Sequence, residues 1–506
     1  MTTIQSIDPR QGVAVEDVTE ATSTEAVTAI ADLAAGAAPE LARLGRGFRA
    51  KLLRAISDGL ESARETIVKI ADRETAIGPA RLNGELTRTA YQARLFADVL
   101  DEGSYLEATI DHAGDTPMGP GPDLRRLLVP IGPVAVFGSS NFPLAFSVPG
   151  GDTVSAIAAG CPVIVKAHTS HPATSRLAFE VLADAAKAVG APEGTFGIVF
   201  GQPSGSALVA DPRIKAVGFT GSLGGGRALL DIIDKRREPI PFYGELASLN
   251  PVVITDAAAA ARGADIADGL VTSVTVSAGQ LCTKPGLVFI PEGPAGDGLT
   301  DTIVKKFSDE GARVLLNERI FESYEATTPD VQGISKLEQQ AFGLDDTAAS
   351  GFSVRPRLFI TTTGDLRPGD AEECFGPTTI VVRYGQLDDL EQTLAALPSS
   401  LTFTLHSEPD ETDLATALSE KMTANAGRIL FNAYPTGVLV SWAQTHGGPW
   451  PATNSLHTSV GTTAIRRFLR PVTWQSAPEH ALPVELRDAD PGIPRRIDGV
   501  LTVPNR

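Results

Sequence analysis

The chain of 506 residues contains few of the residues that build disulfide frameworks or metal clusters: three cysteines and seven histidines. An odd, small number of cysteines argues against a disulfide framework and predicts a reducing compartment. Basic residues are also scarce, because 43 lysines and arginines face 61 acidic residues, which leaves a net charge of −18. This charge repels nucleic acid and anionic membrane surfaces, so an anionic ligand must be held locally by helix ends or a few cations.

Long apolar runs are missing as well. The most apolar region, residues 142–165, is interrupted by prolines, glycines and an aspartate, so it does not resemble a membrane span. The first residues, MTTIQSIDPRQGVAVEDVTE, lack the basic start and the apolar core of a signal peptide. We therefore expect a cytoplasmic protein that binds neither nucleic acid nor membranes.

The order of apolar and polar residues predicts an α/β protein with more than one domain, since the chain is too long for one compact core. Apolar residues at helical spacing predict helices within residues 24–73. Short apolar strands alternate with helices from 134 to 235, which predicts βαβ units around a parallel sheet. A second alternation runs to about residue 440 and includes a helix over 257–280. The tail after Pro471 is rich in proline and charge and predicts an extended arm.

The three cysteines stand in different surroundings. Cys161 begins an apolar strand in AAGCPVIVK, where a small buried filler is the predicted role. Cys374 follows two glutamates, whose charge suppresses the thiolate. Cys282, in SAGQLCTKPG, lies near Lys284 at a turn between a helix ended by Gly279 and a strand. Cys282 is thus the candidate nucleophile, although a lone cysteine is weak evidence without companions.

Two further segments contain candidate binding and catalytic residues. GFTGSLGGG (218–226) predicts a strand, a glycine-rich turn and a helix, which suits a dinucleotide phosphate but differs from the G-x-G-x-x-G fingerprint. FYGELASLNP (242–251) places Glu245 near the end of a strand. Glu245 is either a surface carboxylate with a local partner or a general base with a raised pKa.

Five separated motifs occur in one order: SSNFPLAF (139–146), FTGSLGGG (219–226), ELASLNP (245–251), GQLCT (279–283) and EECFGP (372–377). With these motifs in this order, the chain resembles the NAD(P)-dependent aldehyde dehydrogenase family over roughly residues 20–470. The resemblance implies a Rossmann-like cofactor domain, an α/β catalytic domain and a small β oligomerisation segment. It assigns residues 1–111 and 132–246 to the cofactor domain, 247–440 to the catalytic domain, and 112–131 and 441–506 to bridging strands and a C-terminal arm. Strands at 124–131 and 465–475 are expected to pair between subunits of a homodimer or homotetramer.

The resemblance also implies roles by position. Cys282 would be an exposed nucleophilic thiol that forms a thiohemiacetal and then a thioester with a small-molecule aldehyde. The side-chain amide of Asn141 and the N–H of Cys282 would stabilise the oxyanion. Glu245 would activate the water that hydrolyses the thioester and could help to deprotonate the thiol.

For the cofactor, the resemblance implies that Lys166 contacts ribose hydroxyls, although a lysine that extends to solvent is the alternative. Gly221 and Ser222 belong to the turn that would hold the pyrophosphate. Glu373 would hold the nicotinamide ribose, with Phe375 packed beside it.

Three residues bear on the choice between NAD and NADP. NAD-preferring members of the family often carry a glutamate where this chain has Thr169. Its absence removes repulsion toward a 2′-phosphate, so NADP is the predicted cofactor, with NAD as the alternative. His168 and Arg213 are further candidate phosphate contacts.

Ser140 replaces a tryptophan of the family, and residues 441–475 replace its Phe-Gly-Gly-x-Lys segment. Together with residues 71–100, these departures resemble the branch containing 2-oxoglutarate semialdehyde (2,5-dioxopentanoate) dehydrogenases and long-chain fatty aldehyde dehydrogenases. The first substrate needs cationic anchors, and the second needs an apolar tunnel. The candidate anchors are Arg88, Arg94 and Arg466, with structural ion pairs as the alternative.

Two other functions are open to the same scaffold. An acylating enzyme would pass the thioester to a thiol such as coenzyme A, but Glu245 argues for hydrolysis. A non-catalytic nucleotide-binding scaffold would not need Cys282, Asn141 and Glu245 together. We predict no metal, because only His168 and His171 lie close in sequence and no further His or Cys stands at ligand spacing.

Overall fold

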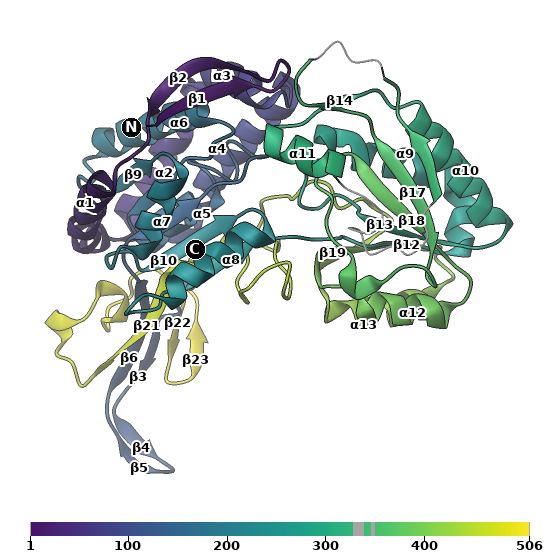
Figure 1. Ribbon diagram of the computed structural model, residues 1–506. Coiled ribbons are helices and arrows are strands. Elements are labelled where there is room, and N and C mark those ends of the chain that lie inside the picture. The colour runs from purple at the N-terminus through teal and green to yellow at the C-terminus, as the bar shows by residue number, and fades with distance from the viewer. Residues whose placement is uncertain (1, 327–337, 346–349, 505–506) are drawn as a thin grey trace.

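The computed structural model describes residues 2–326, 338–345 and 350–504. In this part of the chain the three larger sheets have five, seven and five strands (Figure 1). The predicted α/β class is confirmed. None of the described helices is long and apolar enough to cross a membrane. The predicted segment 247–440 includes residues 327–337 and 346–349, which lie outside the described residues.

The first large sheet is parallel, with strand order β11-β10-β7-β8-β9. Its strands are β7 (Val134–Phe137), β8 (Val163–Lys166), β9 (Phe196–Val199), β10 (Ala216–Thr220) and β11 (Phe242–Glu245). The helices between them are α5 (Gly151–Ala159), α6 (Pro172–Val189), α7 (Gln202–Ala210) and α8 (Leu223–Asp234). The alternation predicted for residues 134–235 is therefore confirmed. Strands β8 and β9 are added on one side of β7, and β10 and β11 on the other, so the order of the strands reverses at β7. Ligands of such sheets bind at the carboxyl ends of the strands at this point.

Successive residues of β7 face opposite sides of this sheet. Val134 and Val136 join a core that contains residues of α5 and α6, whereas Ala135 and Phe137 join a core with residues of α7 and α8. A strand that is buried on both faces explains the unbroken apolar run VAVF.

The amino-terminal part covers this sheet. It begins with a hairpin of β1 (Thr3–Asp8) and β2 (Val13–Glu20). Four helices follow: α1 (Thr24–Arg43), α2 (Gly45–Ser62), α3 (Arg64–Thr75) and α4 (Pro79–Glu102). Ser23 caps α1 by accepting the N–H of Ala26. The apolar residues Leu52, Ile56, Leu60 and Ile67 are fully buried, as expected from their helical spacing.

The second large sheet has the order β15-β17-β18-β13-β12-β19-β20, and β15 alone runs antiparallel to its neighbour. Its strands are β12 (Val252–Ile254), β13 (Leu287–Pro291), β15 (Glu338–Phe342), β17 (Arg357–Thr362), β18 (Thr378–Tyr384), β19 (Ser400–His406) and β20 (Ala426–Phe431). Its helices are α9 (Asp256–Thr275), α10 (Pro294–Ser308), α11 (Glu318–Ala326), α12 (Leu387–Ala396) and α13 (Thr412–Thr423). Strands β14 (Arg313–Val314) and β16 (Ser353–Val354) form a separate short antiparallel pair.

The helix predicted over 257–280 ends earlier than expected. Helix α9 stops at Thr275, and a 3₁₀ turn over Val276–Gly279 follows it. Ser277 and Ala278 have left-handed backbone angles, with φ of 54° and 56°. An α-helix cannot continue through such residues, so the chain changes direction just before Cys282.

The third large sheet has the order β21-β6-β3-β22-β23. Its strands are β3 (Thr109–Asp111), β6 (Leu124–Pro130), β21 (Leu469–Gln475), β22 (Arg495–Ile497) and β23 (Val500–Thr502). Figure 1 shows the hairpin of β4 (Gly114–Thr116) and β5 (Gly119–Gly121) projecting below it.

Strands β6 and β21, which were expected to pair between subunits, pair antiparallel with each other within one chain. Strand β21 still has a free edge in the described sheet, so pairing between subunits stays a prediction. Two other expectations need correction. Residues 462–468 are a 3₁₀ turn, and the strand begins at Leu469. The tail after Pro471 is more than an extended arm, because it returns to the sheet as β22 and β23.

Candidate active site

The residues singled out in the first sheet meet at one edge. Lys166 and Glu245 are the last residues of β8 and β11, while Asn141 and Ser222 follow β7 and β10. The carboxyl ends of parallel strands lie at the same end of the sheet, so these four residues, each at or after the end of a different strand, share one site. Cys282 arrives from the other side, in the loop before β13 of the second sheet.

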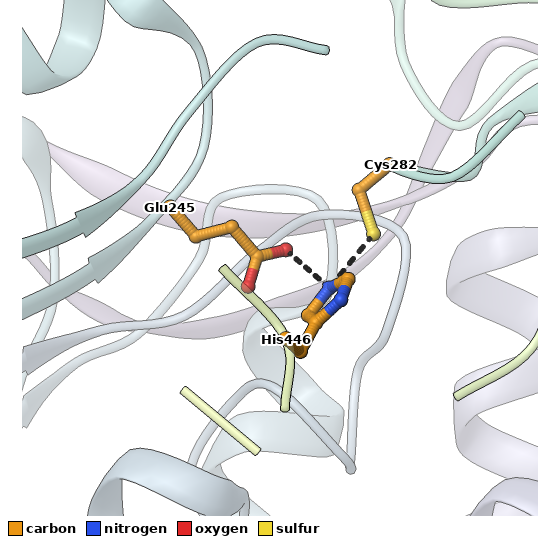
Figure 2. Close-up of side chains that lie close together, drawn as sticks. All are labelled: Glu245, Cys282 and His446. Carbon is orange, nitrogen blue, oxygen red and sulfur yellow. Dashed lines mark hydrogen bonds and ion pairs between the residues drawn. The ribbon is translucent and has the colours of Figure 1, made fainter. Parts of the chain in front are cut away.

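A histidine joins the thiol and the carboxylate. His446 Nε2 lies 2.9 Å from Glu245 Oε1 and 3.5 Å from Cys282 Sγ (Figure 2). The sequence analysis missed His446, because it lies in the segment that departs from the family pattern and is 164 positions from Cys282. The only sequence feature that could have indicated His446 was the presence of a histidine in residues 441–475, which differ from the family pattern.

The segment around His446 is fastened to β11. The N–H of Leu246 donates to the carbonyl of Ala452, and Ser459 Oγ donates to Glu245 Oε2 at 2.6 Å. Thr458 Oγ1 accepts the N–H of His446 at 2.7 Å. The carboxylate of Glu245 is therefore held at both oxygens by side chains of one loop.

The turn that carries Cys282 is held by Asn250, a second residue that the sequence analysis did not assign. Its Nδ2 donates to the carbonyls of Cys282 and Lys284 at 2.8 and 3.0 Å. Gly279 has a φ of +65°, and a Cβ there would lie 2.2 Å from the carbonyl oxygen of Gly376, so no larger residue fits. Cys282 is half-buried rather than exposed as expected.

The pKa values of the thiol and the carboxyl group move in opposite directions. Burial, followed by the negative charge of Glu245, raises the pKa of Cys282 well above its ordinary value, so the thiol needs a base. Burial also raises the pKa of Glu245, but contact with His446 and hydrogen bonds from Ser459 and Cys282 outweigh it. The pKa of Glu245 is therefore lowered, and the expected raised value is wrong.

The other two cysteines are buried. Burial raises the pKa of Cys161 to about 11, and its Sγ contacts the carbonyl of Phe468 at 3.4 Å, in keeping with a structural filler. Cys374 lies among the buried residues of a small core with Tyr324.

Asn141 lies beside the cysteine segment. Its Nδ2 donates to the carbonyl of Gln280 at 2.9 Å, which leaves a second N–H of the amide for another acceptor. The backbone carbonyl of Asn141 accepts a hydrogen bond from Arg81 Nη2 at 2.9 Å. Buried Glu85 accepts the backbone N–H groups at 144–145 and so fixes the loop that presents Asn141.

The start of α8 fits the phosphates of a dinucleotide. Ser222 caps the helix by accepting the N–H of Gly225 at 3.2 Å. The first N–H groups of a helix have no partner within it and carry partial positive charge. At Gly221 a Cβ would lie 2.7 Å from the ring of Phe219, so glycine keeps this turn tight.

Lys166 and its neighbours lie at the end of β8. Among the described residues Lys166 has no hydrogen bond or ion pair, and burial lowers its pKa to about 8. Thr169 is exposed. His168 accepts the N–H of Ser170, and burial lowers its pKa, so its ring is neutral. The structure does not leave Arg213 free for a phosphate, because it pairs with Asp32 and Asp211 at 2.5 and 2.7 Å.

Glu373 and Phe375 lie in the loop before β18, and both are half-buried. Burial raises the pKa of Glu373 to about 7, against the opposing effect of Lys284. Lys284 donates to the carbonyl of Thr378 at 2.6 Å and ties this loop to the turn of Cys282. An unpaired lysine, a capped glycine turn and a carboxyl group thus surround the carboxyl edge of the sheet, and they fit a nicotinamide dinucleotide.

The three candidate anchoring arginines lie in different environments. Arg94 donates to Ser57 and pairs with Asp58 at 2.8 Å, and Arg466 pairs with Glu107 at 3.2 Å. Both arginines form ion pairs at exposed positions. Arg88 differs, since its Nη1 and Nη2 are buried and have no partner among the described residues.

Comparisons with known proteins identify the family. The aldehyde dehydrogenase family model matches residues 1–458. Alpha-ketoglutaric semialdehyde dehydrogenase 2 of Azospirillum brasilense is 42% identical over 509 residues, which cover 98% of this chain and 96% of that protein. Alpha-ketoglutaric semialdehyde dehydrogenase of Acinetobacter baylyi is 41% identical over 467 residues, 90% and 87% of the two chains.

Solved structures show the same fold. A 1-pyrroline-5-carboxylate dehydrogenase from Thermus with bound NAD has a TM-score of 0.80 at 20% identity, covering 94% of this chain and 90% of that one. Methylmalonate-semialdehyde dehydrogenase from Oceanimonas doudoroffii has a TM-score of 0.80 at 20% identity, covering 94% of each. The chain therefore belongs to the aldehyde dehydrogenase family and is an NAD(P)-dependent oxidoreductase that acts on aldehydes.

Proposed function

We propose that the enzyme oxidises 2-oxoglutarate semialdehyde to 2-oxoglutarate with NADP, and the observation that carries the proposal is Arg88. Its Nε donates to the carbonyl of Val438 and its guanidinium lies over the ring of Phe146. Its two terminal nitrogens are buried and have no hydrogen-bond partner in the described part of the chain. A buried, uncompensated charge costs several kcal/mol. A substrate carboxylate would offset that cost by a charge-assisted pair.

Arg88 lies within electrostatic reach of the reacting groups. Burial lowers its pKa, whereas the charges of Glu85, Cys282 and Glu245 oppose that shift. A carboxylate bound to Arg88 would thus leave the other end of a short substrate near the thiol. The names of the two relatives at 41–42% identity support this substrate, since alpha-ketoglutaric semialdehyde is the same compound.

The chemistry begins at Cys282. Its thiol gives up a proton and the sulfur attacks the aldehyde carbon, which forms a thiohemiacetal. The second N–H of Asn141 and the N–H of Cys282 stabilise the negative oxygen. NADP, when bound, supplies the acceptor for the hydride that leaves this carbon. Glu245 then takes a proton from water, and the water hydrolyses the thioester on Cys282 to release the acid and the thiol.

His446 couples the two proton transfers. One nitrogen, Nε2, lies within reach of both Glu245 and Cys282. A single ring nitrogen either donates a proton or accepts one at a given moment. The imidazole can therefore accept from the thiol only when it is not donating to the carboxylate, so the nucleophile and the base are not independent.

The first test is the substitution Arg88→Met, which removes the charge and keeps an apolar stem. We expect kcat/KM for 2-oxoglutarate semialdehyde to fall by roughly 10- to 100-fold, equivalent to the 1.5–3 kcal/mol of a hydrogen bond to a charged group. The rate with pentanal, which lacks a carboxylate, should not change. Arg94→Met is the matched control on the same helix. An equal loss with both aldehydes would contradict the anchoring role.

The preference for NADP rests on Thr169 and the unpaired Lys166. Replacing Thr169 with glutamate should lower kcat/KM for NADP relative to NAD. A carboxylate about 4 Å from a doubly charged phosphate in water is repelled by about 2 kcal/mol, or roughly 30-fold. Initial rates at limiting cofactor measure the ratio, and Thr169→Gln controls for size. An unchanged ratio in the glutamate variant would show that the 2′-phosphate lies elsewhere.

We further infer a homodimer or homotetramer. Strands β21 and β23 are the two opposite edges of the third sheet, and β23 exposes the apolar residues Val500 and Leu501. Edges and apolar patches of this kind favour partners. Sedimentation velocity over a dilution series in the micromolar range should give a mass two or four times that of one chain. A monomer throughout the series would contradict the inference.

A further inference from the structure

One thiol, one imidazole and one carboxylate converge at the active site. The ligand atoms of Glu245, Cys282 and His446 all lie within 4.8 Å of one another. No other group of three such side chains lies this close together in the described part of the chain. The prediction of no metal used spacing in sequence, and spacing does not reveal ligands that are 164 and 201 positions apart.

The distance between Cys282 and His446 matches that between two ligands of one zinc ion. Zinc–sulfur and zinc–nitrogen bonds of about 2.3 and 2.0 Å at a tetrahedral angle place the two atoms roughly 3.5 Å apart. Cys282 Sγ and His446 Nε2 are 3.5 Å apart (Figure 2). Glu245 Oε1, now 2.9 Å from His446 Nε2, would need to withdraw by roughly 0.5 Å to complete the set.

We propose that Glu245, Cys282 and His446 bind one zinc ion, and that zinc is a reversible inhibitor of this enzyme. A thiolate and a carboxylate together balance the charge of a divalent ion. Three protein ligands and one open position are an arrangement that zinc commonly adopts. Ser459 Oγ, bonded to Glu245 Oε2 at 2.6 Å, supplies the outer hydrogen bond that orients a ligating carboxylate.

Binding follows a balanced exchange without oxidation. The thiol of Cys282 releases one proton to solvent, and the freed sulfur lone pair forms the bond to zinc. The hydrogen bond between Glu245 and His446 breaks, and the neutral imidazole carries its one ring proton on Nδ1 in the bound state. Nε2 and a carboxylate oxygen of Glu245 then each donate a lone pair to the ion. Sulfur bound in this way cannot attack an aldehyde, so the ion masks the nucleophile and the base together. A chelator reverses the exchange.

The test uses Co²⁺ as a spectroscopic probe and Zn²⁺ as its competitor, with purified full-length enzyme free of metal and of added thiols. We expect a near-ultraviolet thiolate-to-cobalt charge-transfer band that one equivalent of Zn²⁺ abolishes. Calorimetry in two buffers of different ionisation enthalpy should show about one proton released per ion. Zn²⁺ should inhibit aldehyde oxidation, and a chelator should restore the rate.

Substitutions locate the ion. Cys282→Ser should abolish the band, and His446→Gln should weaken Zn²⁺ binding. Ser459→Ala should weaken it by roughly 10- to 100-fold, as is usual for loss of an outer hydrogen bond. Cys161→Ser and His112→Gln are the controls, because these residues lie outside the site, and both should keep the wild-type band. Thermal melting without metal checks that each variant is folded.

The inhibition depends on the proposed function, whereas binding does not, so the two can fail separately. A band without any aldehyde oxidation would overturn the proposed function and leave the metal site intact. Active enzyme with no band, or a band that survives Cys282→Ser, would overturn the metal site. Inhibition that persists in His446→Gln with unchanged Zn²⁺ affinity would also overturn it.

Discussion

Replacing Glu245 with glutamine is expected to lower the steady-state rate by about 10²- to 10⁴-fold, the usual contribution of a general base. A rapid burst of reduced nicotinamide cofactor, close to one per active site, should remain. In the proposed mechanism hydride leaves the substrate before the thioester is hydrolysed, so loss of the base would trap an acyl-enzyme. Glutamine keeps the size of the side chain and can still bond to Ser459 and His446.

The burst should survive for an electrostatic reason. After burial, the negative charge of Glu245 is the largest factor that raises the pKa of Cys282. A neutral glutamine removes that charge, so the pKa of the thiol falls toward its ordinary value and the thiolate forms at lower pH. The burst rate of the variant should therefore reach its plateau at a lower pH than that of the wild type.

Rapid-mixing absorbance measures the burst, and intact-mass spectrometry detects the acyl-enzyme. Glu372→Gln, at an exposed carboxylate, is the matched control and should turn over normally. A variant with the wild-type steady-state rate would rule out Glu245 as the base. Loss of the burst together with turnover would mean that Glu245 acts before the hydride transfer.

The second large effect is expected at Asn141. Asn141→Ala removes the side-chain donor proposed for the oxyanion, and the cost of losing such a donor is about 3–4 kcal/mol, or roughly 10²- to 10³-fold in kcat. The loss should fall on the burst rate, because the oxyanion forms during attack on the aldehyde. Asn141→Asp, which keeps the shape but lacks the N–H, should lose as much.

Single-turnover rates separate this effect from a change in substrate binding. Asn141 also bonds to the carbonyl of Gln280, so melting temperatures must show that the turn of Cys282 is intact. Asn83→Ala, at an exposed position of α4, is the control. A loss confined to KM, with an unchanged burst rate, would exclude the oxyanion role.

Local features of the sequence were enough to predict the α/β class, the strands from β7 to β10 and the family. Strands that are buried on both faces read as short apolar runs, and the turns after them carry the motifs. Cys282, Glu245, Asn141 and Ser222 each stand in such a motif, so each became a candidate without knowledge of any contact. Their catalytic and binding roles stay predictions that the experiments above address.

Contacts between distant segments could not be predicted in this way. The sequence alone does not distinguish Arg88, Arg94 and Arg466. Packing shows that Asp58 and Glu107 pair with the latter two, while the terminal nitrogens of Arg88 are buried without a hydrogen-bond partner among the described residues. The exposed thiol and the raised pKa of Glu245 were wrong for the same reason. Both properties depend on what surrounds a group in three dimensions.

By itself, then, the sequence determined the family, the order of the strands along the chain and the candidates for the reactive groups, because backbone pattern and motif are properties of neighbouring residues. The tertiary structure alone decided which groups share protons and charge. It placed His446 between Glu245 and Cys282, fastened the turn of Cys282 through Asn250, and buried Arg88 beside them. Burial and charge act over a few ångströms in space whatever the separation in sequence, so the chain must fold before they exist.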